Sequence, residues 1–151
     1  MIRIFPDSNI YIEALVSPWS TLRAILILAR LKLFRLLLSP YVETEIEEYL
    51  LRRLSQDYAE GSRLLDDYHK ALTLLAPERL PSITEEEHQN HFALIRHSHD
   101  VSVLATATKA SPDWLITLNI GHFTPEVAAR TGLRIVTPHR FLRSFELSTL
   151  H

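Results

Sequence analysis

Short apolar runs alternate with longer amphipathic stretches along this chain of 151 residues. The short runs have the length and continuous apolar character of strands buried on both faces. The longer stretches repeat apolar residues every three or four positions, as helices with one buried side do. The pattern predicts strands over 2–5, 33–38, 114–117 and 133–136, and helices over 10–16, 21–32, 40–53, 58–72, 85–95, 101–112, 125–131 and 138–145. Residues 72–76 fit either a helix end or a short strand, and Pro77 and Pro81 predict a loop.

Strands that alternate with helices predict an α/β fold, with a parallel sheet, right-handed crossovers and helices on both faces. The length and the 46% of hydrophobic residues fit one globular domain over residues 1–151. The chain has no cysteine, which excludes disulfides, thiolate zinc sites and cysteine nucleophiles. The glycine-rich phosphate loops of common nucleotide-binding folds are also absent from the sequence, so those folds are disfavoured.

Charge and hydropathy bound the location and the partners. The formal net charge of −2 gives no overall basic surface for nucleic acid, although it leaves room for a local basic groove. The most apolar stretch, 22–38, is interrupted by four cations, so it does not read as a membrane span. The first residues lead straight into a strand without a charged leader or a cleavage site. We therefore expect a soluble, cytoplasmic protein without a membrane partner.

Several side chains with metal-binding oxygens lie at predicted strand ends or on the inner face of a predicted helix, where they can converge on one site. Asp7 and Asn119 follow predicted strands, and ligands of α/β sheets bind beyond the carboxyl ends of the strands. Asp100 shares one side of its helix with Val103 and Leu104, which predicts that it faces inward. Each residue alone also fits a helix cap or a turn. Together they indicate a site for a hard cation, and such a cation suggests phosphate chemistry.

The helix that begins near residue 40 carries four acids, and their positions around the helix single out one of them as facing inward. Glu45 lies at the edge of the apolar stripe that contains Val42 and Ile46. An inward carboxylate is costly unless it meets a cation or hydrogen-bond donors, so Glu45 is the candidate for a functional role. The other three acids are Glu43, Glu47 and Glu48, and we expect them on a solvated face.

These residues stand in an ordered set of motifs that spans nearly the whole chain. The motifs are Ile-Phe-Pro-Asp7-Ser-Asn9, Ser39-x-x-Val-x-x-Glu45, Asp100-x-x-x-Leu-Ala-x-Ala107, Leu-Ile-Thr-Leu-Asn119-Ile-Gly-His-Phe123 and Ile135-Val-Thr-Pro138-His-Arg-Phe-Leu142. The set resembles the PIN-domain family. The resemblance implies a three-layer α/β/α sandwich with a central parallel sheet, and a metal-dependent nuclease, a hydrolase that acts mainly on RNA.

The resemblance also implies a role for each candidate residue. Asp7, Glu45 and Asp100 match the first three acidic positions of the family, and Asn119 stands where an Asp is usual. Asp7, Asp100 and Glu45 would hold Mg²⁺ or Mn²⁺, with Glu45 orienting or activating a water for attack on a phosphodiester. Asn119 would serve through its amide oxygen or hold a water. Because Asn119 removes one negative charge, chemistry with one metal ion becomes more plausible than chemistry with two.

Small members of this family resemble the toxin half of VapC-like toxin–antitoxin pairs, which are usually dimeric and inhibited by an antitoxin peptide. The expected partners are therefore an RNA substrate, an antitoxin protein and a second copy of the chain. The apolar helix over 22–29 is either core or a partner surface. The alternative to an endoribonuclease is a catalytically degenerate interaction module of the same fold, and Asn119 motivates that alternative.

Histidines offer two weaker hypotheses. His88 and His91 lie three residues apart on an expected helix, and His97 and His99 flank Ser98, but no further ligand pattern completes a zinc site. His122 lies near the expected centre of the site. We expect it to be an exposed loop residue, and contact with a substrate phosphate is the less favoured alternative.

Overall fold

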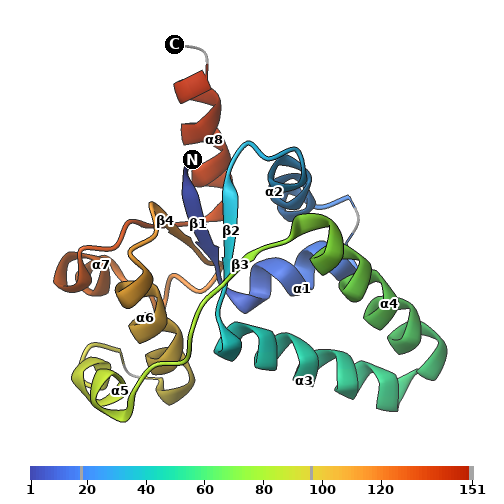
Figure 1. Ribbon diagram of the computed structural model, residues 1–151, viewed down its shortest axis with the longest axis horizontal. Helices are drawn as coiled ribbons and strands as arrows, with labels where there is room; N and C mark the ends of the chain where they lie inside the picture. Colours follow the sequence, from blue (N-terminus) through green and yellow to red (C-terminus); the bar gives the residue numbers. More distant parts are fainter. Residues whose placement is uncertain (18, 96, 150–151) are drawn as a thin grey trace.

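Parallel strands form the centre of the molecule (Figure 1), and the computed structural model describes residues 1–17, 19–95 and 97–149. The five-stranded sheet has the order β3-β2-β1-β4-β5, and every neighbouring pair of strands is parallel. The strands are β1 (Arg3–Pro6), β2 (Arg35–Leu38), β3 (Glu78–Arg79), β4 (Trp114–Ile116) and β5 (Ile135–Val136).

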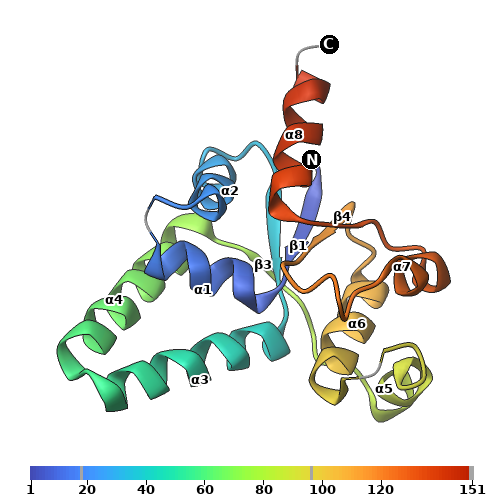
Figure 2. The same ribbon diagram turned by 180° about the vertical axis from the view of Figure 1, so that it is seen from behind.

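Helices lie on both sides of these strands, as two opposite views show (Figures 1 and 2). One side holds α1 (Ser8–Val16), α2 (Thr21–Arg30), α3 (Pro40–Gln56) and α4 (Tyr58–Leu75). The other side holds α5 (Glu85–His91), α6 (Ser98–Ala110) and α7 (Pro125–Thr131), and α8 (Pro138–Thr149) closes the described chain. The predicted three-layer α/β/α arrangement around a parallel sheet is confirmed.

The strands are buried because they supply the middle layer of the core. Ile4 and Phe5 of β1 and Leu115 of β4 are fully buried, as is Leu37 of β2. This continuous apolar character is what a sheet covered on both faces requires. Phe141 attaches α8 to this core by edge-to-face contacts with Phe34, at 5.4 Å between ring centroids, and with Trp114, at 6.2 Å.

Several helices begin where the polar capping residues of the sequence predict. The side chains of Asp7, Ser39 and Thr124 each accept a hydrogen bond from a backbone N–H in the first turn of the following helix. Thr84 and Glu87 form a capping box at the start of α5, with both reciprocal bonds present. These caps fix the entry of each helix, and those at Asp7 and Ser39 lie directly after strands of the sheet.

The region 72–81 differs from its prediction. Residues 72–75 complete α4, and Ala76 ends that helix in the left-handed conformation, with φ of 42°. The expected loop between Pro77 and Pro81 contains β3, which pairs with the buried strand β2. Glu78 of β3 also forms a 2.5 Å ion pair with Arg3 of β1. A two-residue polar strand at a sheet edge carries no apolar run, so the hydrophobic pattern missed it.

Two helix boundaries near the expected site were also wrong. The helix predicted to reach about residue 95 ends at His91, and a turn follows. The next helix begins at Ser98 with His97 as its N-cap. Asp100 was expected to cap that helix, but it lies inside the first turn, and its side chain is therefore directed to other partners.

No single helix of the described residues is long and apolar enough to span a membrane, and only α1 with α2, joined across a bend of 102°, reaches such a length and composition.

Candidate active site

The carboxyl ends of β1 and β4 meet where the strand order reverses. The chain adds β2 and β3 on one side of β1 and later adds β4 and β5 on the other. Asp7 follows β1 directly, and its backbone N–H donates to the carbonyl of Ile116 at 2.8 Å. Thr117 follows β4 directly. In open α/β sheets, ligands bind in the crevice at such a reversal, so the residues after β1 and β4 form the candidate site.

Asp7 is held rigidly in this crevice, which we call the acidic crevice after Asp7 and Asp100. Only 4% of Asp7 is exposed. Its Oδ1 accepts the backbone N–H of Ser8 at 2.8 Å, and its Oδ2 accepts the Thr117 hydroxyl at 3.0 Å. These two bonds fix both oxygens while leaving each a further lone pair.

The surroundings of Asp7 disfavour the ionised form of its carboxyl group. Burial is the main cause that raises the pKa of Asp7 above its ordinary value, and the nearby charge of Asp100 adds to the rise. The bonds from Ser8 and Thr117, and the proximity of His122, act in the opposite direction without cancelling the effect. A desolvated carboxylate beside a second anion is the environment that a bound cation would relieve.

A tight turn after β4 brings an amide and a histidine to the same place. Thr117 is fully buried, and its Oγ1 accepts the backbone N–H of Asn119 at 2.9 Å. The carbonyl of Asn119 in turn accepts the backbone N–H groups of His122, at 3.1 Å, and of Phe123, at 3.0 Å. Phe123 is buried and anchors the turn in the core. The side chains of Asn119 and His122 are thereby fixed over the acidic crevice.

Asp100 enters the crevice from the first turn of α6. Its Oδ2 lies 2.6 Å from Nδ1 of His122, and the side-chain amide of Asn119 lies 2.8 Å from the same nitrogen. Nδ1 of His122 thus lies between the carboxylate of Asp100 and the amide of Asn119, and the tautomer of the ring decides which of the two it bonds as donor or acceptor. The ring of His97 stacks on that of His122, with 3.5 Å between centroids and 16° between planes. Asp100 is therefore positioned by a histidine that is itself held on two sides.

Glu45 reaches the crevice from α3. Its Oε2 accepts the hydroxyl of Ser8 at 2.5 Å, and Ser8 is a buried residue directly after Asp7. Glu45 thus lies inward, as its place on the helix predicts. Glu43, which was expected on a solvated face, forms a 2.5 Å ion pair with Arg79, whereas Glu48 is exposed.

The donor set suits a hard cation that keeps part of its water shell. Among the described residues, no three His, Cys, Asp or Glu side chains are grouped closely enough to hold one metal ion. Mg²⁺ characteristically uses one or two carboxylates with several waters, so the pair Asp7 and Asp100 fits it. The three-carboxylate site that includes Glu45 stays a prediction, and so does ligation by Asn119.

Sequence reasoning missed part of this network. Ser8 was given no role of its own, and Thr117 was predicted only as the end of a strand. The available signal was a hydroxyl residue next to Asp7 and another two positions before Asn119. His122 was expected to be an exposed loop residue, which is wrong: it is half-buried and contacts Asp100. A lone histidine in a loop has no periodicity, and its partner lies 22 residues away in the chain.

The zinc hypothesis finds no support in the described side chains, which do not include that of His99. Nδ1 of His91 lies 2.8 Å from the carbonyl of Glu87, within its own helix. His88 lies near Ser102, and His97 stacks on His122. These histidines point to separate partners rather than to one ion.

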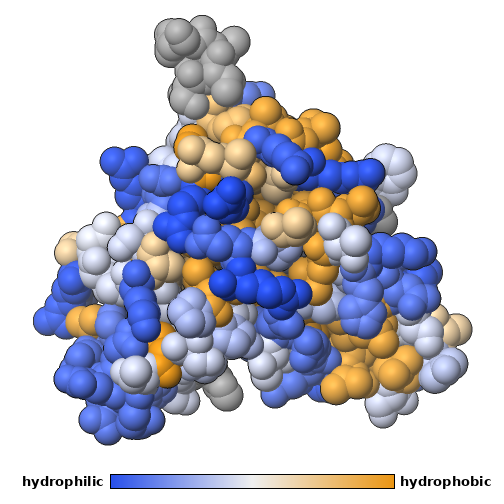
Figure 3. Space-filling view, in the orientation of Figure 1, coloured by the Kyte–Doolittle hydropathy of each residue, from blue (hydrophilic) through white to orange (hydrophobic). Residues whose placement is uncertain are grey.

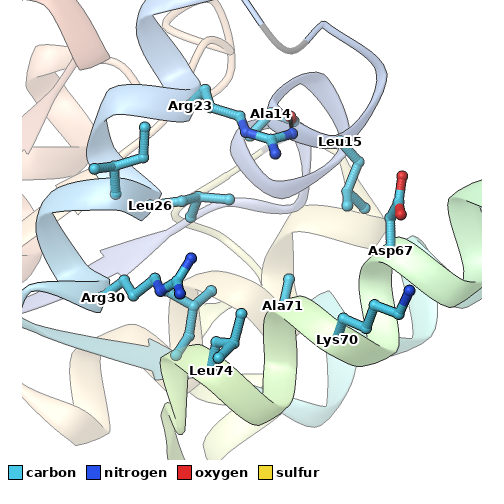
Figure 4. Close-up of a pocket in the computed structure, with 11 residues that line it drawn as sticks. Ala14, Leu15, Arg23, Leu26, Arg30, Asp67, Lys70, Ala71 and Leu74 are labelled. Carbon is cyan, nitrogen blue, oxygen red and sulfur yellow. Dashed lines mark hydrogen bonds between the residues drawn. The ribbon is translucent and has the colours of Figure 1, made fainter.

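A second concave surface lies between α1, α2 and α4, and we call it the helical groove (Figure 4). Arg23 reaches from α2 to α1, where it donates to the carbonyl of Ala14 at 3.3 Å, and Lys70 and Asp67 stand on α4. Arg30 also lines the groove from α2. The groove has a volume of about 270 Å³. Its apolar lining is formed by Ala14, Leu15, Leu26, Ile27, Ala71, Leu74 and Leu75.

The surroundings of this groove are apolar by comparison with the other side of the molecule. Ile27, in the last turn of α2, is 52% exposed, and Leu31, just beyond the end of that helix, is 65% exposed. On the face shown in Figure 3, apolar surface gathers around α2, whereas the surface around α5 is hydrophilic. An exposed apolar surface with polar edges is typical of a protein-binding site. The helix over 22–29 contributes Leu22 and Ile25 to the core and leaves Ile27 exposed, and its use as a partner surface stays a prediction.

Comparison with known proteins connects this geometry to a family. The sequence model of the PIN domain matches residues 3–121, which is most of the chain. No curated protein matches the chain.

Solved structures share the fold at low sequence identity. VapBC2 from Rickettsia felis, solved with a DNA fragment from its promoter, is 17% identical, with a TM-score of 0.62 over 90% of this chain and 98% of that chain. FitAcB from Neisseria gonorrhoeae is 16% identical, with a TM-score of 0.65 over 89% and 97%. PAE2754 from Pyrobaculum aerophilum is 13% identical, with a TM-score of 0.63 over 97% and 98%. At these identities the likeness concerns the fold.

Proposed function

The chain belongs to the PIN-domain family, whose members are generally nucleases that use a divalent metal, and from that premise we propose that it is a metal-dependent endoribonuclease. The observation that carries the proposal is the pair of Asp7 and Asp100 at the sheet reversal. Asp7 is buried, and its pKa is raised by burial and by the neighbouring charge of Asp100. A bound cation would offset the repulsion between these two carboxylates.

The residues of the crevice divide the work of phosphodiester hydrolysis. Mg²⁺ or Mn²⁺ held by Asp7 and Asp100 would neutralise the charge that develops on the phosphate oxygens. Ser8 and Thr117 hold Asp7 in place, and His122 holds Asp100.

Glu45 orients the attacking water and accepts its proton. The water oxygen forms a bond to phosphorus as the bond from phosphorus to the 3′-oxygen breaks. The leaving oxygen takes a proton from solvent, so the products carry a 5′-phosphate and a 3′-hydroxyl. The 2.5 Å bond from Ser8 to Glu45 sets the carboxylate beside Asp7 for this role.

Cleavage of labelled single-stranded and structured RNAs with Mg²⁺ or Mn²⁺ tests the proposal. Asp100→Asn keeps the size of the side chain and removes its charge. We expect a loss of at least about 100-fold in rate, the scale measured when one electrostatic contact to a transition state is removed. Asp66→Asn is the matched control, because Asp66 is an exposed acid of α4. An unchanged cleavage rate in Asp100→Asn, or after a chelator removes the metal, would refute the mechanism.

A protein inhibitor is the second part of the proposal. The fold neighbours include VapBC2, and the sequence motifs resemble VapC-like toxins, which antitoxins inhibit. We propose that the chain is the toxin of such a pair and that its helical groove receives a segment of the antitoxin. Three cations and one acid line an apolar surface there, so the fitting segment combines acidic and apolar side chains.

Co-expression with the product of the adjacent gene tests this partner. Inhibition of RNA cleavage by the co-purified complex, relieved when Arg23→Glu and Arg30→Glu are combined, would support the helical groove as the binding site. Inhibition that is unchanged by the charge reversals would place the partner elsewhere. A homodimer and a cytoplasmic location also stay proposals, and light scattering of the purified chain tests the former.

A catalytically degenerate interaction module is the alternative function. Asn119 in place of an acid and the lack of a three-ligand group among the described residues favour it. The two functions differ in their response to metal. A nuclease site gains thermal stability from Mg²⁺ or Mn²⁺ and loses the gain in Asp7→Asn, whereas a degenerate module shows neither effect.

A further inference from the structure

Two histidine rings lie face to face beside the acidic crevice. The centroids of His97 and His122 are 3.5 Å apart, and the planes are inclined by 16°. His122 is fixed from below by its bond to Asp100, and 30% of its side chain is exposed. His97 is exposed and presents its ring toward solvent from the N-cap position of α6. The pair is therefore an aromatic platform attached to a residue of the site.

The platform opens into a groove formed by the end of α5, the turn after β4 and α7. The groove has a volume of about 630 Å³ and is distinct from the helical groove. Phe92, 61% exposed, offers a second aromatic ring on its wall. Arg130 stands at the α7 side, and among the residues that the structure describes its one ion pair is with Glu126 of its own helix, at 3.9 Å between exposed side chains. Such a pair is weak, so the guanidinium is available to an anionic ligand.

Flat rings with a cation nearby are the means by which proteins hold unpaired bases. Every base has a π-face, so stacking on an aromatic side chain tolerates any sequence, while the cation contacts the backbone. We propose that the stacked His97–His122 pair receives one unpaired base of the RNA, next to the phosphate that is cleaved in the acidic crevice. The inference rests on the proposed ribonuclease function and extends it to the substrate.

The position of the platform determines which nucleotide it holds. His122 contacts both the ring of His97 and the carboxylate of Asp100. A base stacked on His97 therefore belongs to a nucleotide adjacent to the scissile phosphate. Bases inside a duplex cannot reach such a platform, since their faces are covered by their neighbours. The enzyme should therefore prefer loops and single strands.

Steady-state cleavage with three variants tests the platform. His97→Ala removes the ring and is expected to raise KM about tenfold, the scale of one base–aromatic contact, with most of the loss in KM rather than kcat. His97→Phe keeps a flat ring and is expected to restore KM to within about twofold of the wild type. His69→Ala is the matched control, because His69 is an exposed histidine of α4, away from both rings.

Substrates with a single abasic position separate binding from a structural effect. Removal of the one base that stacks on His97 should cost the wild type as much as His97→Ala does, and the two losses should not add. Full additivity at every position near the cut would overturn the platform, and so would an unchanged KM in His97→Ala.

A binding measurement keeps this test separate from that of the nuclease. Fluorescence anisotropy of a labelled single-stranded oligoribonucleotide with Asp7→Asn, with and without His97→Ala, reports the platform without catalysis. If the wild type cleaves RNA and His97→Ala binds as tightly as its parent, the platform is wrong and the nuclease stands. If the wild type fails to cleave, weaker binding in His97→Ala still supports the platform, and equal binding refutes it.

Discussion

In the acidic crevice Asp7 is buried, Asp100 is largely shielded from solvent, and hydrogen bonds fix both, whereas the cations of the helical groove are exposed beside an apolar lining. Asp7 is 4% exposed, and both of its oxygens accept hydrogen bonds. Arg30 and Lys70 are exposed, and neither forms an ion pair with a described residue. The charge of Asp7 therefore lowers the free energy of unfolding, whereas the exposed charges of the groove hardly change it.

This difference indicates which kind of ligand would suit each surface. Burial of a carboxylate is unfavourable and is relieved by a cation, which suits the proposed metal ion. Exposed cations around apolar side chains suit a polypeptide that brings its own acids and apolar residues. Substitutions in the two regions should therefore change the free energy of unfolding by very different amounts.

The largest expected effect is on the scaffold of the groove. A Cβ at Gly61 would lie 2.4 Å from Cα of Leu54, where α4 meets α3. Because backbone cannot yield like a flexible side chain, Gly61→Ala should destabilise the fold by roughly 3 kcal/mol or more, lowering Tm by about 6–12 °C. Gly121→Ala is the control, since nothing lies within 4 Å of its Cβ position. Equal melting temperatures of the two variants would show that α3 and α4 separate without cost.

Metal binding should give the next largest effect, and only through the crevice. Mg²⁺ or Mn²⁺ at one hundred times its dissociation constant stabilises the folded state by about 2.7 kcal/mol, or roughly 5–11 °C in Tm. Asp7→Asn should abolish this rise, and Glu48→Gln, an exposed acid of α3, should leave it intact. Differential scanning fluorimetry with a metal titration measures it. A rise that persists in Asp7→Asn would place the ion elsewhere.

The pH dependence of Asp7 should be smaller and opposite in sign to that of an ordinary paired acid. Its pKa in the folded state is raised above the reference value of 3.8 by burial and by Asp100. Its favourable contribution is therefore present below pH 3.8 and is lost as the pH rises through the folded-state pKa. Without metal, Asp7→Asn should be more stable than the wild type at pH 7 by about 1 kcal/mol, or roughly 2–4 °C.

A comparison of the wild type with Asp7→Asn across pH separates the contribution of Asp7 to stability from the contributions of the other carboxyl groups. Glu78 has a lowered pKa because Arg3 donates to it, so its contribution has the opposite sign and is common to both proteins. Denaturant unfolding at several pH values gives the difference directly. A constant difference between pH 4 and pH 8 would mean that Asp7 carries its charge without cost.

The smallest expected effect belongs to the groove cations. Arg30→Glu reverses a charge that is exposed and unpaired within the described chain, so the free energy of unfolding should change by less than about 0.5 kcal/mol. The metal-induced rise in Tm should also stay the same. A loss of several degrees would show that Arg30 supports the fold and would remove the contrast between the two regions.

Local signals predicted most of the fold because they act within a few residues. The helix over 125–131 has the predicted bounds, since Thr124 caps it, Pro125 begins it and Gly132 ends it in the left-handed conformation. The end of α5 escaped prediction because residues 92–95 are apolar enough to continue a helix. Glu78 and Arg79 become a strand only because β2 and Arg3 are there to pair with them.

The candidate site was predictable as a set of positions but not as a network. Asp7 and Glu45 follow from strand ends and helix faces, which the sequence states directly. The hydroxyl of Thr117 and the ring of His122 gain their roles from neighbours far along the chain, and no periodic pattern encodes such contacts. The stacking of His97 on His122 depends on where α6 begins, which was the boundary misplaced by the reading of Asp100 as a cap.

The bond between Asp7 and Thr117 joins residues 110 positions apart, and this separation has a consequence for biosynthesis. A ribosome adds about 5–20 residues per second, so roughly 5–20 s pass between the appearance of the two side chains. During that time the nascent chain holds Asp7 without the strand and turn that complete its surroundings. The surroundings of Asp7 are therefore complete only after β4 and Thr117 have been synthesised and folded, and any chemistry that needs the acidic crevice begins only then.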